Sequence, residues 1–94
     1  MEGIDRAVAL PARLDVGTSA AVRSQVHRAL AENEGDLVLD LRAVEIVDAA
    51  GLGVLVGVRR RAEADGRSVV LRETPVRVER LLDATRLSRL FVLG

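Results

Sequence analysis

Short apolar runs alternate with amphipathic helical patterns along the chain. Nearly continuous apolar runs predict strands at residues 7–10, 37–41 and 68–72, and residues 90–93 predict a final strand or an apolar tail. Residues 13–16 can continue the first strand after Pro11 interrupts it. Apolar residues at helical spacing predict three helices between these strands, and Gly35 and Gly66 are expected to end the first two. This alternation is typical of an α/β domain, with a mostly parallel four-stranded sheet and three or more helices.

The starts of the helices can be assigned from residues that cap. Thr18 or Ser19 can cap the first helix, and Asp48 is placed to accept backbone N–H bonds at the start of the second. Thr74 followed by Pro75 predicts a cap and a first helical position for the third. The side chains expected to face inward are Val22, Val26, Ala29 and Leu30, then Leu52, Leu55, Val56 and Ala62, and finally Val78, Leu81 and Leu82.

Composition narrows the class of protein. With 94 residues the chain has length for one core, and a single domain is expected over residues 1–94. Its 14 basic residues balance 14 acidic ones and Phe91 is its only aromatic residue, so no direct binding of nucleic acid is expected. No apolar run is long enough for a bilayer span, and Glu2 and Asp5 follow Met1 where an export signal would be basic and then apolar. We expect a cytoplasmic protein without membrane insertion.

Candidate catalytic groups are few. The chain has no Cys, and His27 is its only histidine, expected to face solvent beside the apolar stripe of the first helix. Asp15, Asp40 and Asp48 fall near strand ends. They can be interpreted as a carboxylate cluster for a hard cation or for acid–base chemistry, or as ordinary turn and cap residues. The sequence therefore predicts no enzyme, no cofactor and no metal.

Three glycines lie in the first turns of the second helix. Gly51, Gly53 and Gly57 each cost about 1 kcal/mol relative to alanine at such positions. Close packing of the helix on the sheet is one explanation. A surface without side chains, against which the backbone of another protein can lie, is a second explanation and is compatible with the first.

Residues 40–53, which read DLRAVEIVDAAGLG, resemble the signature of STAS domains, particularly that of bacterial anti-sigma factor antagonists. Residues 13–19 are similar to the Gly-x-Leu-Asp segment that precedes the first helix in this family. Residues 81–91 are similar to its closing Leu-x-x-x-x-Leu-x-x-Leu-Phe stretch. The resemblance covers nearly the whole chain and implies a small STAS-like α/β domain.

The resemblance implies a regulator of transcription that is not an enzyme. In this family the unphosphorylated antagonist binds an anti-sigma factor, usually a serine kinase with a histidine-kinase-like ATPase fold, and thereby frees a sigma factor. Phosphorylation of a serine in the Asp-Ser-Ser/Thr/Ala-Gly motif ends that binding. Here Ala49 and Ala50 occupy both candidate hydroxyl positions, so the usual phosphorylation is not expected. The partner-binding residues implied are Asp15, Thr18, Asp48, Ala49, Ala50, Gly51, Leu52 and Gly53.

Other interpretations stay open. Similar domains are subunits of membrane lipid-transport ATPase complexes, where they brace the ATPase and need no phosphate, and an enzyme that uses the Asp residues is a third hypothesis. Thr18 and Ser19 are alternative phosphoacceptors near the same surface.

The family commonly begins with two strands, whereas residues 1–10 have room for one. An open sheet edge would then allow a weak homodimer in place of a monomer.

Overall fold

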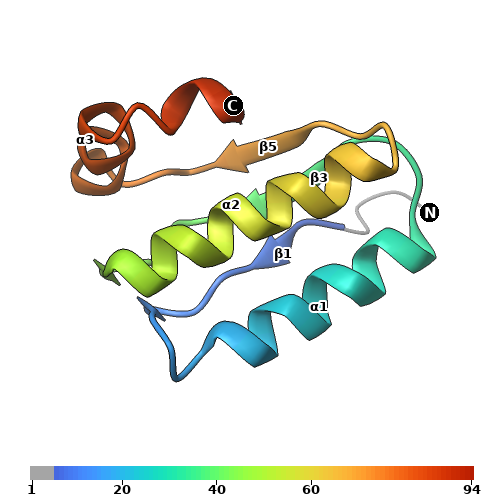
Figure 1. The fold of residues 1–94 in the computed structure, drawn as a ribbon, viewed down its shortest axis with the longest axis horizontal. Helices are drawn as coiled ribbons and strands as arrows, with labels where there is room; N and C mark the ends of the chain where they lie inside the picture. Colours follow the sequence, from blue (N-terminus) through green and yellow to red (C-terminus); the bar gives the residue numbers. More distant parts are fainter. Residues whose placement is uncertain (1–5) are drawn as a thin grey trace.

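Single strands or pairs of strands alternate with helices along the chain (Figure 1). The structure is a computed structural model that describes residues 6–94. Its strands are β1 (Val8–Ala9), β2 (Arg13–Leu14), β3 (Leu37–Asp40), β4 (Ile46–Val47), β5 (Val69–Arg72) and β6 (Val92–Leu93), and its helices are α1 (Ser19–Glu32), α2 (Ala49–Ala64), α3 (Val76–Ala84) and the 3-10 turn η1 (Ser88–Leu90). Four parallel strands form a sheet in the order β1-β3-β5-β6. The predicted α/β fold with a four-stranded parallel sheet is confirmed.

The strand β2 does not extend β1, and the prediction that residues 13–16 continue the first strand is wrong. Pro11 has no N–H to offer to a sheet, and the chain turns away after it. The carbonyl of Ala12 then accepts a hydrogen bond of 3.0 Å from the N–H of Ile46. This places β2 beside β4, with Leu14 opposite Val47, in a separate parallel two-stranded sheet. The sequence prediction contains no separate strand at β4.

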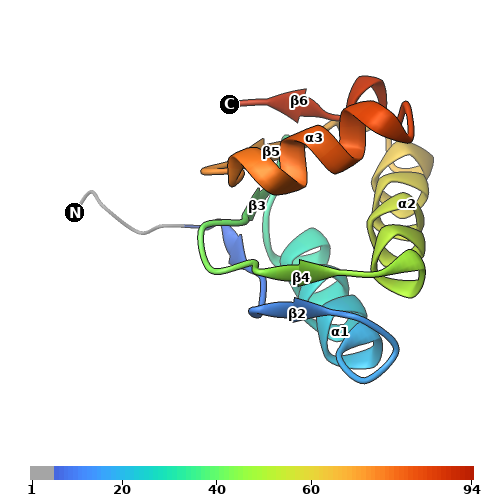
Figure 2. The ribbon, with the colours of Figure 1, turned by 90° about the vertical axis from the view of Figure 1, so that its left-hand side faces the viewer.

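The helices α1 and α2 cover one side of the larger sheet, and the core lies between these helices and the sheet (Figure 2). Alternate residues of β3 and β5 are buried, because successive side chains of a strand point to opposite faces. The predicted inward side chains that are buried are Val22, Val26, Leu30, Leu55, Ala62, Val78 and Leu82, and Ala29 and Leu52 are partly buried against the core. Val56 and Leu81 are only half-buried. In α2 the buried positions are those of Val54 and Val58 instead of Val56, because Val56 follows Leu55 on the flank of the helix.

The helix starts agree with the sequence prediction in α1 and α2 and differ in α3. Asp48 is the N-cap of α2, as predicted. Thr18 is at the N-cap of α1, but its side chain makes no capping hydrogen bond. The helix α3 begins one residue later than predicted, because Pro75 keeps an extended ψ of 146° and is itself the N-cap. Gly35 and Gly66 follow the ends of α1 and α2 with φ of 82° and 73°, the left-handed conformation that favours glycine.

Asp40, at the end of β3, is held as a carboxylate by its neighbours. Its Oδ1 accepts a hydrogen bond of 3.0 Å from the N–H of Arg42, and its Oδ2 accepts one of 3.3 Å from Nη2 of Arg72. The N–H of Arg42 is the main cause that lowers the pKa of Asp40. The two guanidinium groups add to this effect, against the opposing influence of burial. The carboxylate therefore stabilises the end of the strand as long as it stays ionised.

We expect Asp40→Asn to lower the free energy of unfolding by about 1 kcal/mol at neutral pH. The folded-state pKa of Asp40 is below the unfolded-state pKa. The stabilisation is therefore present above the unfolded-state pKa and is lost as the pH falls through the folded-state pKa. Urea unfolding monitored by circular dichroism should show a difference in the free energy of unfolding between the native chain and Asp40→Asn, and this difference should narrow in acid. Asp36→Asn, at an exposed position, is the matched control. A difference in unfolding free energy of equal size at neutral and acidic pH would contradict this explanation.

Candidate functional site

Two loops meet where β2 and β4 end. Because these strands are parallel and paired, the residues that follow them emerge at the same edge (Figure 2). The N–H of Asp48 donates a hydrogen bond of 3.3 Å to the carbonyl of Leu14, which joins the start of α2 to the end of β2. Residues 15–18 and residues 48–53 thus form one continuous surface, which we call the candidate surface. Seven of the eight residues expected to bind a partner are exposed or half-buried there, whereas Gly51 is buried.

The loop of residues 15–18 is shaped by its own polar side chains. Asp15 Oδ1 accepts hydrogen bonds from the N–H of Gly17 at 2.9 Å and of Thr18 at 3.2 Å. Thr18 Oγ1 donates to the carbonyl of Arg13 at 2.8 Å. These bonds leave Val16 at the tip of the loop with 80% of its surface exposed. Sequence reasoning missed Val16, although an apolar residue inside a polar turn was a signal available for finding it.

The start of α2 presents a smooth surface. Asp48 Oδ1 accepts a hydrogen bond of 2.9 Å from the N–H of Gly51 and so caps the helix. Ala49 and Ala50, the next two residues, are both exposed. Leu52 is half-buried and packs against the core. The exposed part of the candidate surface on α2 therefore offers small apolar groups and backbone, next to the carboxylate of Asp48.

The glycines of α2 divide into two kinds. Gly51 is buried against β2, and a Cβ atom at this position would lie 2.0 Å from the carbonyl oxygen of Leu14. A Cβ atom at Gly53 or Gly57 would meet no atom within 4 Å. Close packing explains Gly51, whereas packing within the described part of the chain does not explain the other two. Gly53 and Gly57 are both exposed.

The three aspartates that fall near strand ends each have a structural role. Asp15 shapes its loop, Asp48 caps α2, and Asp40 is paired with arginines in the larger sheet. Among residues 6–94, no group of three or more His, Asp or Glu side chains is arranged to hold a metal ion. His27 is exposed on α1, as predicted, and lines none of the candidate surface.

Thr18 and Ser19 carry hydroxyl groups at the start of α1, next to the start of α2. The hydroxyl of Ser19 donates a hydrogen bond of 3.1 Å to the carbonyl of Val16, and that of Thr18 is bound to the backbone as described above. A phosphate on either residue would break these bonds. Ala49 and Ala50 have no hydroxyl to offer.

Within the described residues, no helix has the length and apolar character needed to cross a membrane. Residues Glu2 and Asp5, on which the expectation about an export signal rests, lie outside the described part of the chain.

Comparison with known proteins gives consistent results. Residues 1–93 match the STAS domain. The chain is 34% identical over 83 residues to the anti-sigma-B factor antagonist of Bacillus subtilis (strain 168), and the match covers 88% of this chain and 75% of that protein. The fold is similar to the crystal structure of a candidate anti-sigma factor antagonist from Thermotoga maritima, with a TM-score of 0.77 and 25% sequence identity, over 98% of this chain and 81% of that one.

Proposed function

The chain belongs to the STAS domain family, and from this premise we propose that it is an anti-sigma factor antagonist whose binding is not switched at residues 49 and 50. Its partner would be an anti-sigma factor of the serine-kinase type with a histidine-kinase-like ATPase fold. Binding would free a sigma factor in the cytoplasm. The observation that carries this proposal is the pair of exposed alanines, Ala49 and Ala50, directly after the cap of α2.

The composition of the candidate surface supports protein binding. Val16 is mostly exposed, and Ala49, Ala50 and Gly53 add small groups that let a partner's backbone approach closely. Surfaces of this kind lose little side-chain entropy on binding, because they have few rotatable groups to fix. The loop of residues 15–18 is also held in place by internal hydrogen bonds, so little ordering is needed there.

The alanines also explain why binding would persist. A phosphate would bring a charge of about −1.5 to −2 to this surface, beside the carboxylates of Asp15 and Asp48. Alanine instead has nearly the shape of unmodified serine and no atom that accepts phosphate. The surface of Ala49 and Ala50 would therefore always resemble the state that binds. Regulation would then depend on the amounts of the two proteins.

Affinity capture from a lysate of the source organism tests the proposed partner. The native chain should recover a kinase-type anti-sigma factor, identified by mass spectrometry. Val16→Glu should lose it, because this residue is 80% exposed within the candidate surface. Val76→Glu, at a site 63% exposed at the start of α3, is the matched control and should still bind. Recovery of transporter ATPase or permease subunits, or equal capture by both variants, would overturn the proposal.

Phosphorylation can then be tested with the recovered kinase and ATP. We expect the native chain to take up no phosphate, because residues 49 and 50 have no hydroxyl. Ala50→Ser and Ala49→Ser supply that hydroxyl at exposed positions, and at least one of them should become a substrate. Mass spectrometry of peptides covering α1 and α2 would locate the phosphate. Phosphate on Thr18 or Ser19 of the native chain would contradict the proposal.

A further inference from the structure

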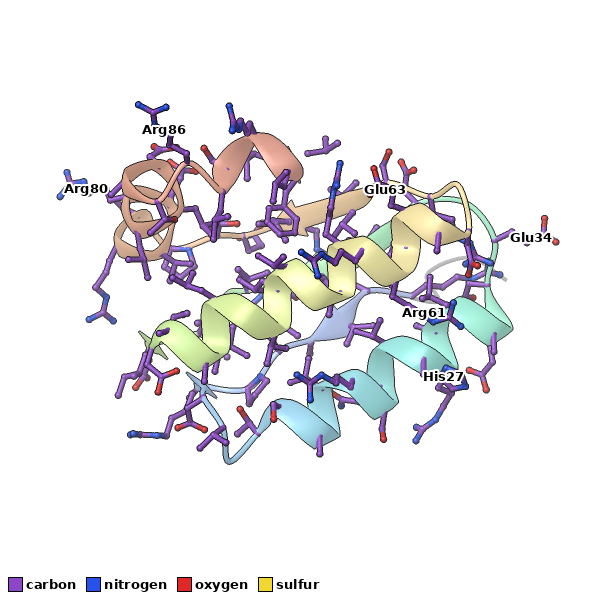
Figure 3. The ribbon with its side chains drawn as sticks, in the orientation of Figure 1. His27, Glu34, Arg61, Glu63, Arg80 and Arg86 are labelled. Carbon is purple, nitrogen blue, oxygen red and sulfur yellow. The ribbon has the colours of Figure 1, made fainter. Side chains whose placement is uncertain are left out.

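A groove runs between α1 and α2, away from the candidate surface. The two helices pack side by side, and the groove between them has a volume of about 260 Å³. Its lining residues are Arg23, Val26 and His27 of α1 and Gly57, Val58 and Arg61 of α2. Figure 3 shows His27 and Arg61 on the side of the molecule where these helices lie next to each other.

The floor of the groove is apolar, and the space above Gly57 is open. Val26 and Val58 are 2% and 3% exposed and belong to the core. Gly57 lines the groove beside them and has no side chain, and a Cβ atom added there would meet nothing within 4 Å. A glycine in a helix costs about 1 kcal/mol relative to alanine. Since packing does not require this glycine, its effect is to leave open space over the helix backbone at residue 57, where another molecule can approach closely.

The rim of the groove is basic. Arg23 and His27 are four residues apart on α1 and therefore share one face of that helix. Arg61 faces them from α2, and no residue that the structure places in the lining is acidic. Arg61 has an ion pair of 3.5 Å with Asp65, and the two side chains of that pair are 48% and 38% exposed, so it neutralises the rim only weakly. Glu63 pairs instead with Arg59 on the other side of α2 (Figure 3).

We propose that this groove is a docking site for an acidic segment of a partner protein. The backbone of the segment would lie over Gly57, and its carboxylates would reach Arg23 and Arg61 on opposite rims. Arginine binds carboxylates through paired hydrogen bonds, and the methylene groups of a glutamate fit the apolar floor. A nucleic acid fits less well, because the lining has no Phe, Tyr or Trp side chain and His27 alone could stack on a base.

The groove and the candidate surface have no residue in common, although both use α2. The exposed residues Ala49, Gly53 and Gly57 recur at every fourth position and connect the two sites along one face of the helix. A partner on the candidate surface could therefore reach the groove, but occupation of the groove does not depend on that partner. The two proposals can fail separately.

Titration of the labelled native chain with a peptide, followed by NMR, tests the groove. The probe is an alanine-based helical peptide with glutamate at every fourth position, and the control peptide has glutamine in its place. We expect the amide signals of His27, Gly57 and Val58 to shift with the glutamate peptide, and the shifts to shrink as salt is added. No shift at these residues, or equal shifts with the glutamine peptide, would overturn the proposal.

Substitutions then distinguish binding of the peptide at the groove from non-specific electrostatic attraction to the protein surface. Arg23→Gln combined with Arg61→Gln should weaken binding of the peptide at least about tenfold. Arg60→Gln combined with Arg77→Gln removes the same charge from exposed positions outside the groove and should change the affinity less than about twofold. Gly57→Leu should block binding by filling the groove, with the helical circular dichroism signal retained. Equal losses in the two arginine pairs, or tighter binding of anionic vesicles than of the peptide, would overturn the proposal.

Discussion

Gly51→Ala is expected to destabilise the protein by on the order of 4 kcal/mol, a large part of the stability of a domain of this size. The added Cβ atom would lie 2.0 Å from the carbonyl oxygen of Leu14 and 2.7 Å from its carbonyl carbon. These are backbone atoms, so no side chain can rotate to make room. Leu14 is itself fully buried, and its strand β2 is paired with β4. To accept the methyl group, α2 would have to move away from the small sheet.

Gly53→Ala and Gly57→Ala are the matched controls for this prediction. Both add the same methyl group to the same helix at positions with no atom within 4 Å. Alanine favours helix over glycine, so each control should raise the free energy of unfolding by up to about 1 kcal/mol. Urea unfolding followed by circular dichroism is suitable, because the chain has no Trp or Tyr for fluorescence. If Gly51→Ala were as stable as Gly53→Ala, the close contact with Leu14 would be wrong.

Ala50→Asp is expected to weaken binding to the proposed anti-sigma factor on the order of 100-fold. The new carboxylate would stand at an exposed position beside Asp48 and would be desolvated without a partner when the complex forms. The fold should not suffer, because a negative charge in the first turn of a helix is favoured by the helix dipole. The loss of affinity would therefore come from the interface and not from unfolding.

Isothermal titration of the purified partner with native chain, Ala50→Asp and Ala50→Ser measures this effect. The serine variant adds a small neutral group at the same exposed position and should bind nearly as well as the native chain. Circular dichroism of all three chains shows whether they are equally folded. Unchanged affinity of Ala50→Asp would mean that the partner binds elsewhere on the molecule.

Most of the fold could be predicted because its signals are local in the sequence. Buried parallel strands are apolar throughout, and β3 and β5 were found for this reason. The errors fall where a distant contact decides the local structure. Residues 13–14 look like a continuation of β1, but the hydrogen bonds from β4 to Ala12 and the pairing with Ile46 and Val47 place them in a second sheet.

The candidate surface was predictable in part. The cap at Asp48 is a local signal and appears in the structure as expected. The hydrogen bond from Thr18 to the carbonyl of Arg13 replaces the predicted cap, because the preceding strand brings that carbonyl within reach. The groove beside Gly57 could not be predicted, because it depends on how α1 and α2 pack. Spacing within each helix does not contain that information.

The exposure of Ala49 and Ala50 has a consequence for how this protein can change over generations. Alanine and serine codons differ by a single base, and neither position has a packing contact that a hydroxyl would disturb. The cap at Asp48 and the contact of Gly51 with Leu14 would both remain after such a change. One point mutation therefore separates a chain that cannot be modified at the start of α2 from one that can.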